Sequence, residues 1–279
     1  MGRFIAVLLF VALLVPAVFV GRVWSHAAAR REVSNGALSL TVPTTEAERA
    51  MKVQAQRARR WRLAGLVVAL GLSVAALVMF AESAVFLWPG LLIGGLLGGV
   101  LLGELTRLQP TWEARAPARR PQGEFIDRAL PTIGRLAALG LIAFGVLTMD
   151  QGWAQQVRIA AGIAVGVWLL VEVTLERLAR RGTPRGSEDI PVDDALRINS
   201  AHVAVGAGSI LTLLVLSGLL MATGVRLGDS ASGADLAPVA LIAGAFGALV
   251  GALVVAAFLV KWLAPVRWAQ AAWGTSQRG

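Results

Sequence analysis

Long apolar runs, separated by short polar segments, dominate the pattern of this chain. Seven such runs are visible, over residues 4–21, 63–80, 85–103, 132–149, 154–171, 203–225 and 236–260. A helix needs roughly 20 predominantly apolar residues to cross the hydrocarbon core of a bilayer, and each run is near that length. We therefore predict an all-α, polytopic integral membrane helical bundle with about seven transmembrane helices.

The spacing of the runs predicts three hairpins after a lone first helix. The turns within the hairpins are short and fall at residues 81–83, 150–152 and 228–234. The longer connections are the basic segment 22–62 and the loops 104–131 and 172–202. None of them is long enough to fold as an independent catalytic domain, so residues 1–279 are expected to form a single membrane domain.

Basic residues mark one side of the predicted bundle. The segment 22–62, the two long loops and the C-terminal tail are rich in arginine, whereas the hairpin turns carry little positive charge apart from Arg226. Because cytoplasmic loops collect Lys and Arg, we expect the N-terminus outside and the C-terminus inside, in a multi-pass protein of the cell (plasma) membrane. Arg3, the first run and residues 27–29 also fit a cleaved secretory signal, but cleavage would place the basic segment outside.

Composition excludes most other classes. Hydrophobic residues make up 56% of the chain and charged residues 15%, with a mean hydropathy of +0.69. The net charge of +9 is spread over the loops, so no basic folded domain for nucleic acid is expected, while anionic lipid headgroups are expected partners of the basic segment 22–62. Cysteine is absent and only two histidines occur, so we expect neither a metal site nor a cofactor.

Three ionisable residues are candidates for an ion or proton pathway: Glu104, Glu172 and His202. Each lies within or beside an apolar run, where charges often mark a transport route. Both glutamates also lie near the cytoplasmic boundary, where pairing to a residue one turn away, as between Glu176 and Arg180, is an alternative. The corresponding alternative for Asn199, Ser200 and His202 is a helix cap with a boundary histidine.

No catalytic group emerges from the pattern. Ser209 and His202 fall on the same predicted helix, whereas an intramembrane serine protease needs them on facing helices. The acidic cluster Glu188, Asp189, Asp193 and Asp194 could bind a divalent cation, but a solvated loop or an acidic first helical turn is favoured. We therefore expect no enzyme activity.

Small residues recur every four positions in two of the runs. They are Gly90, Gly94 and Gly98, with the parallel set Gly95, Gly99 and Gly103, and then Ala240, Gly244, Ala248 and Ala252. Such ridges let helices approach closely. We predict helix-packing interfaces there, most simply within the chain and alternatively with another subunit.

A weak internal repeat relates the first two hairpins. Residues 62–66 read Arg-Leu-Ala-Gly-Leu and residues 135–139 read Arg-Leu-Ala-Ala-Leu. The same hairpins end in Glu-Leu-Thr-Arg at 104–107 and in Glu-Val-Thr-Leu-Glu-Arg at 172–177. The repeat indicates duplication of a hairpin with both copies in the same orientation, which occurs in transporters and in scaffolds.

Two stretches carry a resemblance to a family. Gly-Glu-Leu-Thr-Arg at 103–107 and Val-Asp-Asp-Ala-Leu-Arg at 192–197, followed by Asn199 to His202, resemble an uncharacterised integral membrane protein family of high-GC actinobacteria. The resemblance implies no activity. It implies an association with transcriptional regulators and ABC-transporter genes, without a mechanism.

These patterns lead to two functional hypotheses. The first is a non-catalytic membrane subunit, accessory or scaffold to a larger transport or envelope assembly such as a transporter complex. The alternative is a small-molecule permease or exporter built from hairpin repeats, with a polar cavity ringed by Glu104, Glu172 and His202. A structure distinguishes them, because the permease needs those three residues to face a common space.

Overall fold

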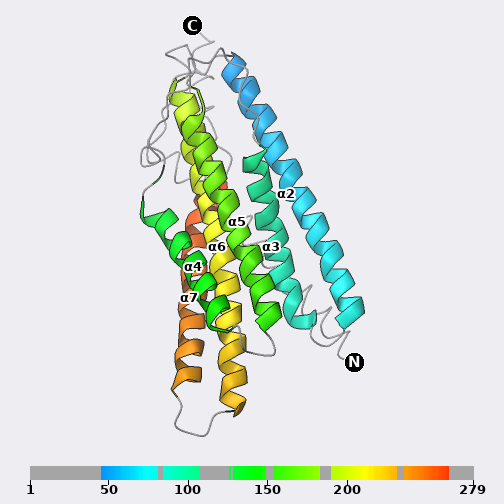
Figure 1. Ribbon diagram of the computed structural model, residues 1–279. Helices are drawn as coiled ribbons and strands as arrows, with labels where there is room; N and C mark the ends of the chain where they lie inside the picture. The colour runs from blue at the N-terminus through cyan, green and yellow to red at the C-terminus, as the bar shows by residue number, and fades with distance from the viewer. Residues whose placement is uncertain are drawn as a thin grey trace.

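In the part of the chain that it describes, the computed structural model is all-helical. It describes residues 45–80, 84–106, 126, 128–148, 154–182, 190–230 and 236–263. The helices are α2 (Thr45–Phe80), α3 (Ala84–Leu105), α4 (Ala129–Leu147), α5 (Ala154–Arg180), α6 (Ile190–Ser230) and α7 (Ala237–Leu263). Figure 1 shows them side by side in one elongated bundle.

Four of these helices are long and apolar enough to cross a membrane. Their spans are Ala129–Leu147, Val157–Arg180, Leu196–Gly228 and Ala237–Val260. Within the described residues, α3 contributes a shorter apolar stretch, Leu91–Leu105. The first predicted run, 4–21, lies outside the described residues. The prediction of a helical membrane protein is confirmed at this level, and the count of seven spans stays a prediction.

Helix α6 lies at the centre of the bundle. It packs against α3, α4, α5 and α7, and 61% of its apolar span is buried. Helix α2 packs on α3, at the side of the bundle away from α4 and α7 (Figure 1). The main core joins α6 to its neighbours through side chains such as Leu101, Val171, Val205 and Val255.

Glycine contacts set the distance between α2 and α3. A Cβ added at Gly65 would collide with the carbonyl oxygen of Gly95 and would lie 2.8 Å from Cα of Gly99. One added at Gly95 would collide with Ala69. The two backbones are therefore in direct contact, which is the packing expected of small residues spaced by four.

The connection between α5 and α6 is shorter than predicted. The loop placed at 172–202 is largely helical, because α5 continues to Arg180 and α6 already begins at Ile190. Asn199, Ser200 and His202 therefore lie inside α6, and the interpretation of these residues as a helix cap is wrong. Ion pairs and hydrogen bonds stabilise the end of α5 and the start of α6, which both extend beyond the apolar runs.

Four arginines gather at one end of the bundle. Arg177, Arg180 and Arg181 lie at the end of α5, and Arg197 of α6 lies beside them. We call this the basic end. The opposite end, where α4, α6 and the start of α5 and α7 meet the hairpin turns, is called the far end.

Candidate functional site: polar contacts near the basic end

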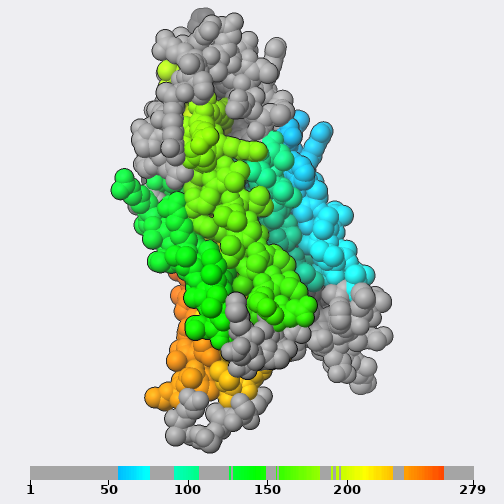
Figure 2. Space-filling view, in the orientation of Figure 1, coloured from blue at the N-terminus to red at the C-terminus, as the bar shows by residue number. Residues whose placement is uncertain are grey.

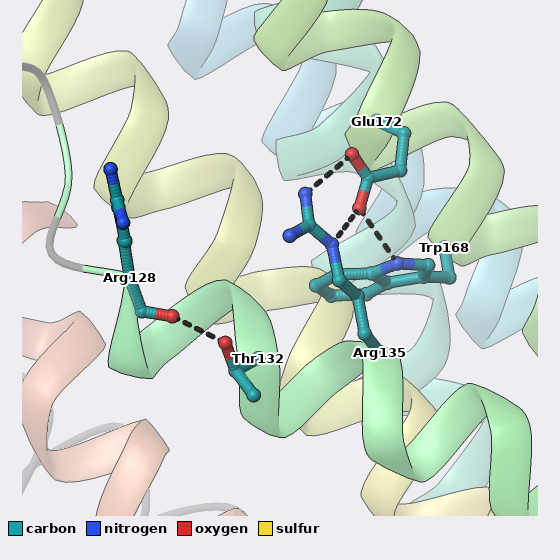
Figure 3. Close-up of polar contacts among 5 residues, drawn as sticks. All are labelled: Arg128, Thr132, Arg135, Trp168 and Glu172. Carbon is teal, nitrogen blue, oxygen red and sulfur yellow. Dashed lines mark hydrogen bonds and ion pairs between the residues drawn. The ribbon is translucent and has the colours of Figure 1, made fainter. Parts of the chain in front are cut away.

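Glu172 forms an ion pair with Arg135 across the α4–α5 seam (Figure 3). Nε of Arg135 donates to Oε1 of Glu172 at 2.8 Å, and Nη2 donates to Oε2 at 3.0 Å. The indole Nε1 of Trp168, one turn before Glu172 on α5, donates to Oε1 at 3.1 Å. The side chains of Arg135 and Glu172 are 46% and 30% exposed, so the pair lies at the surface of the bundle.

Two glycines fix the position of the Trp168 ring. A Cβ at Gly134 of α4 would collide with the ring, and one at Gly208 of α6 would lie 3.5 Å from its Cε3 atom. Trp168 itself is 5% exposed. The indole therefore fills the junction of α4, α5 and α6, and it presents its N–H to Glu172 at the edge of that junction.

Glu104 lies inside the bundle, at the end of α3. Its side chain is buried, and its Oε2 atom accepts a hydrogen bond of 2.7 Å from the hydroxyl of Ser200 on α6. Arg62 of α2 is close enough for the two charges to interact. Burial lowers the pKa of the Arg62 guanidinium, and the negative charge of Glu104 raises it in partial compensation. Glu104 thus connects α2, α3 and α6.

His202 lies on a third seam, between α6 and α7. Its Nδ1 atom is 2.8 Å from the carbonyl oxygen of Ile198, one turn earlier on the same helix. The imidazole ring lies 5.7 Å from the ring of Phe258 on α7, measured between centroids. His202 therefore contributes to the packing of α7 on α6.

The three candidate pathway residues are thus held at three different helix pairs. Glu104 contacts α6 from α3, Glu172 contacts α4 from α5, and His202 faces α7 from α6. Each is engaged by neighbouring groups, and the contacts do not bring the three together around a common space.

A buried ionic cluster closes the α5–α6 connection. Of the two alternatives favoured from the sequence, the acidic first helical turn is confirmed, because Asp193 lies in the first turn of α6. The solvated loop is wrong for Asp193, which is buried and paired. Asp193 accepts a hydrogen bond of 2.7 Å from Nε of Arg197 and forms an ion pair with Arg181 at 2.8 Å. Arg197 is fully buried and also donates to the carbonyl oxygens of Leu178 and Gly182, at 2.9 and 2.7 Å. It therefore caps the C-terminus of α5. The spacing of four between Asp193 and Arg197 was the available signal.

Nearer the surface, two more arginines engage partners at this end. Arg180 pairs with Glu176 at 2.6 Å, which confirms the i,i+4 pairing expected from the sequence. Arg177 donates through Nη1 to the carbonyl oxygen of Leu105, at 3.2 Å, and so links the ends of α3 and α5. Arg107, one helical turn after Glu104 in the sequence, lies outside the described residues.

The predicted small-residue ridges differ in what they contact. Gly95 and Gly99 face α2, whereas Gly94 and Gly98 have no atom within 4 Å of an added Cβ. On α7, Ala252 is buried and Ala248 packs against the core, while Gly244 approaches Leu220 and Ala240 is exposed. The side-chain surroundings of Gly90 are outside the described residues. Within the described chain, close packing on α3 therefore uses the set beginning at Gly95.

Among the residues that the structure describes, no group of three His, Asp or Glu side chains is arranged to hold a metal ion. No protein-family model, curated protein or solved structure matches the chain. The interpretation of the polar contacts therefore rests on their geometry.

Proposed function

We propose that this chain is a non-catalytic integral membrane subunit, accessory or scaffold to a larger transport or envelope assembly. The observation that supports it most directly is the engagement of Glu104, Glu172 and His202 at three separate helix seams. A charged or polar group that binds a neighbouring helix stabilises the bundle. A transport site instead needs polar groups that converge on the substrate near the bilayer midplane.

The alternative of a permease or exporter requires a polar cavity ringed by those three residues. The described contacts do not favour such a ring. Ser200 of α6 donates a hydrogen bond to Glu104, and Arg135 and Trp168 donate hydrogen bonds to the carboxylate oxygens of Glu172. A permease would need these contacts to break during transport. The accessory-subunit proposal needs no such rearrangement.

In the proposed topology, seven helices span the plasma membrane with the basic end in the cytoplasm. Arg177, Arg180, Arg181 and Arg197 gather at one end of the bundle, which is the distribution expected of a cytoplasmic face. The resemblance to actinobacterial membrane proteins is compatible with this arrangement. Anionic headgroups are the proposed lipid partners of the basic segment 22–62, and a transporter complex is the proposed protein partner.

Purification from native membranes in a mild detergent, followed by mass spectrometry, tests this function. A stoichiometric protein partner that remains bound would support the accessory-subunit proposal and identify the assembly. Recovery of the chain with no other protein would contradict it.

Transport assays with Glu104→Gln and Glu172→Gln then test the permease. The matched control is Glu176→Gln, which also replaces a glutamate, here the one that pairs with Arg180 at the surface. We expect all three variants to behave alike in uptake and efflux assays. A loss of transport in the first two variants only, with unchanged folding, would favour the permease.

A further inference from the structure

The α6–α7 hairpin extends beyond the far ends of the neighbouring helices. On α6, Arg197 reaches the carbonyl of Leu178, and a Cβ at Gly208 would meet Val171 of α5. With a rise of about 1.5 Å per residue, this register places the start of α5 level with about residue 224 of α6. Helix α6 continues to Ser230, and Figures 1 and 2 show α6 and α7 projecting past α4 and α5.

Two exposed arginines on α5 indicate where the hydrocarbon core lies. Arg158 and Arg177 are both exposed and are nineteen residues apart, which corresponds to about 28 Å along the helix. The hydrocarbon core of a bilayer is about 30 Å thick. Between the two arginines the fully exposed side chains are apolar, among them Ile159, Ile163 and Leu169. The partly exposed carboxylates of Glu172 and Glu176 lie close to Arg177, and both are paired with arginines. The arginines therefore bracket the part of α5 that faces lipid.

With that placement, the outermost part of the α6–α7 hairpin lies outside the hydrocarbon. We call residues 221–230 of α6 and 236–242 of α7 the tip. It exposes Val225 (49%), Leu227 (37%), Leu236 (78%) and Val239 (64%). Acyl chains do not cover apolar side chains at this level, although the exposed Arg226 lies between Val225 and Leu227. Exposed apolar side chains gathered outside the hydrocarbon favour an interaction site.

The apolar surface of the tip continues along the whole of α7. One face of this helix carries Val239, Ala243, Phe246, Val250, Leu253 and Ala257, all of them exposed. The alternating spacing of four and three residues is that of a helix–helix seam. Only 17% of the apolar span of α7 is buried, against 61% for α6.

We propose that this face of α7 binds the same face of a second copy of the chain, about a two-fold axis. An isologous interface uses one patch on both subunits, so the patch must complement itself. No charged residue occurs from Ala237 to Val260, so two copies would not repel each other. Large Phe246 lies beside Ala243 and Gly247, and no atom lies within 4 Å of a Cβ at Gly247. A second α7 covers Val239 of the tip together with the membrane-embedded part of this face, whereas lipid covers only the latter.

The absence of cysteine from the chain makes disulfide cross-linking the natural test. Single cysteines are placed at Val239, Phe246, Val250 and Leu253, and native membranes are treated with a mild oxidant. Matched controls are Val67→Cys on α2 and Leu169→Cys on α5, which are 66% and 59% exposed. Ala245→Cys serves as a buried control on the α6 side of α7. We expect dimer yields several-fold above all controls at the four positions on the proposed seam.

Equal yields at Val67 and Leu169, or no cross-linking on α7, would overturn the proposal. A second readout is the mass of the unmodified protein in mild detergent, which we expect to be that of a dimer. A monomer in detergent together with absent cross-links in membranes would also overturn it. Neither readout depends on a bound heterologous partner, so failure here is distinguishable from failure of the accessory-subunit function.

Discussion

Arg135 of α4 and Glu172 of α5 form a two-pronged ion pair, with hydrogen bonds of 2.8 and 3.0 Å, and Trp168 completes it. The pair is partly exposed at the bundle surface. Its Glu172 end is about 7 Å along α5 from Arg177. In the proposed membrane placement the two charged groups lie just inside the edge of the hydrocarbon core and neutralise each other, which is the setting in which ionic groups in membrane helices are tolerated.

We expect removal of either partner of this pair to weaken the α4–α5 hairpin. Arg135→Gln or Glu172→Gln should lower the stability of the bundle by about 0.5–2 kcal/mol, the range measured for polar contacts between membrane helices. Thermal unfolding of the purified protein in detergent measures the change. The charge-reversed double variant Arg135→Glu with Glu172→Arg should recover part of the loss. If the double variant is as unstable as the losses of its component single variants, Arg135→Glu and Glu172→Arg, added together, the pair is not energetically coupled.

The buried cluster at the α5–α6 connection should be far more sensitive. Asp193→Asn removes the carboxylate that pairs with the buried Arg181 and Arg197, and breaking a buried ion pair typically costs about 3–5 kcal/mol. Arg180→Gln, which breaks the exposed pair with Glu176, is the matched control and should change stability by less than about 1 kcal/mol. Denaturant or thermal unfolding compares the two. Similar losses in both variants would show that Asp193 does not stabilise the connection.

Glycine substitutions on α3 should separate the packed ridge from the open one. Gly95→Ala and Gly99→Ala place a Cβ against α2, at Ala69 and at the backbone of Trp61, and should cost about 1–3 kcal/mol through overpacking. Gly94→Ala and Gly98→Ala add a Cβ to open space and should be neutral or stabilising, because alanine favours helix. Unfolding midpoints of the four variants give the comparison. A loss at Gly94 equal to that at Gly95 would indicate that another molecule already occupies the open ridge.

The hydrophobic pattern predicted most of the fold, because the length and apolarity of a run decide whether it can be a membrane helix. Six predicted runs coincide with α2 to α7, within a few residues at the turn ends. The pattern failed for the extension of α6 back to Ile190. That extension is stabilised by polar contacts to α5, such as those of Arg197 with Leu178 and Gly182, and apolar periodicity does not report them.

The sequence predicted which residues belong to the candidate site, but it did not predict which residues they bind. Glu104 and Glu172 stand out because charge is rare in the runs, but their partners Ser200 and Arg135 lie 96 and 37 residues away. Spacing rules applied to one sequence predict pairs of side chains only within one turn of the same helix. The internal repeat did indicate a relationship between Arg and Glu residues, because both hairpins begin with Arg and end with Glu. The structure pairs Arg135 with Glu172 and places Arg62 near Glu104.

Two serines of α6 allow a test of what the hydrogen bond to Glu104 contributes. Ser200 and Ser209 are both fully buried on the same helix. The hydroxyl of Ser200 donates to Glu104, whereas that of Ser209 has no hydrogen-bond partner among the described residues. Ser200→Ala should therefore cost about 1–3 kcal/mol, because a hydrogen bond to a buried charged group is lost.

Ser209→Ala is the matched variant and should be neutral or stabilising. It removes a buried hydroxyl that has no partner to compensate for its desolvation, beside the ring of Trp168 and Gly134. Parallel unfolding curves of the two alanine variants measure the difference, which we expect to favour Ser209→Ala by more than about 1 kcal/mol. If Ser209→Ala is instead the more damaging change, the Ser209 hydroxyl binds a group such as an internal water molecule, and the junction of α4, α5 and α6 contains a polar site. No loss of stability in Ser200→Ala would mean that the Ser200–Glu104 contact contributes nothing to the packing of α3 on α6.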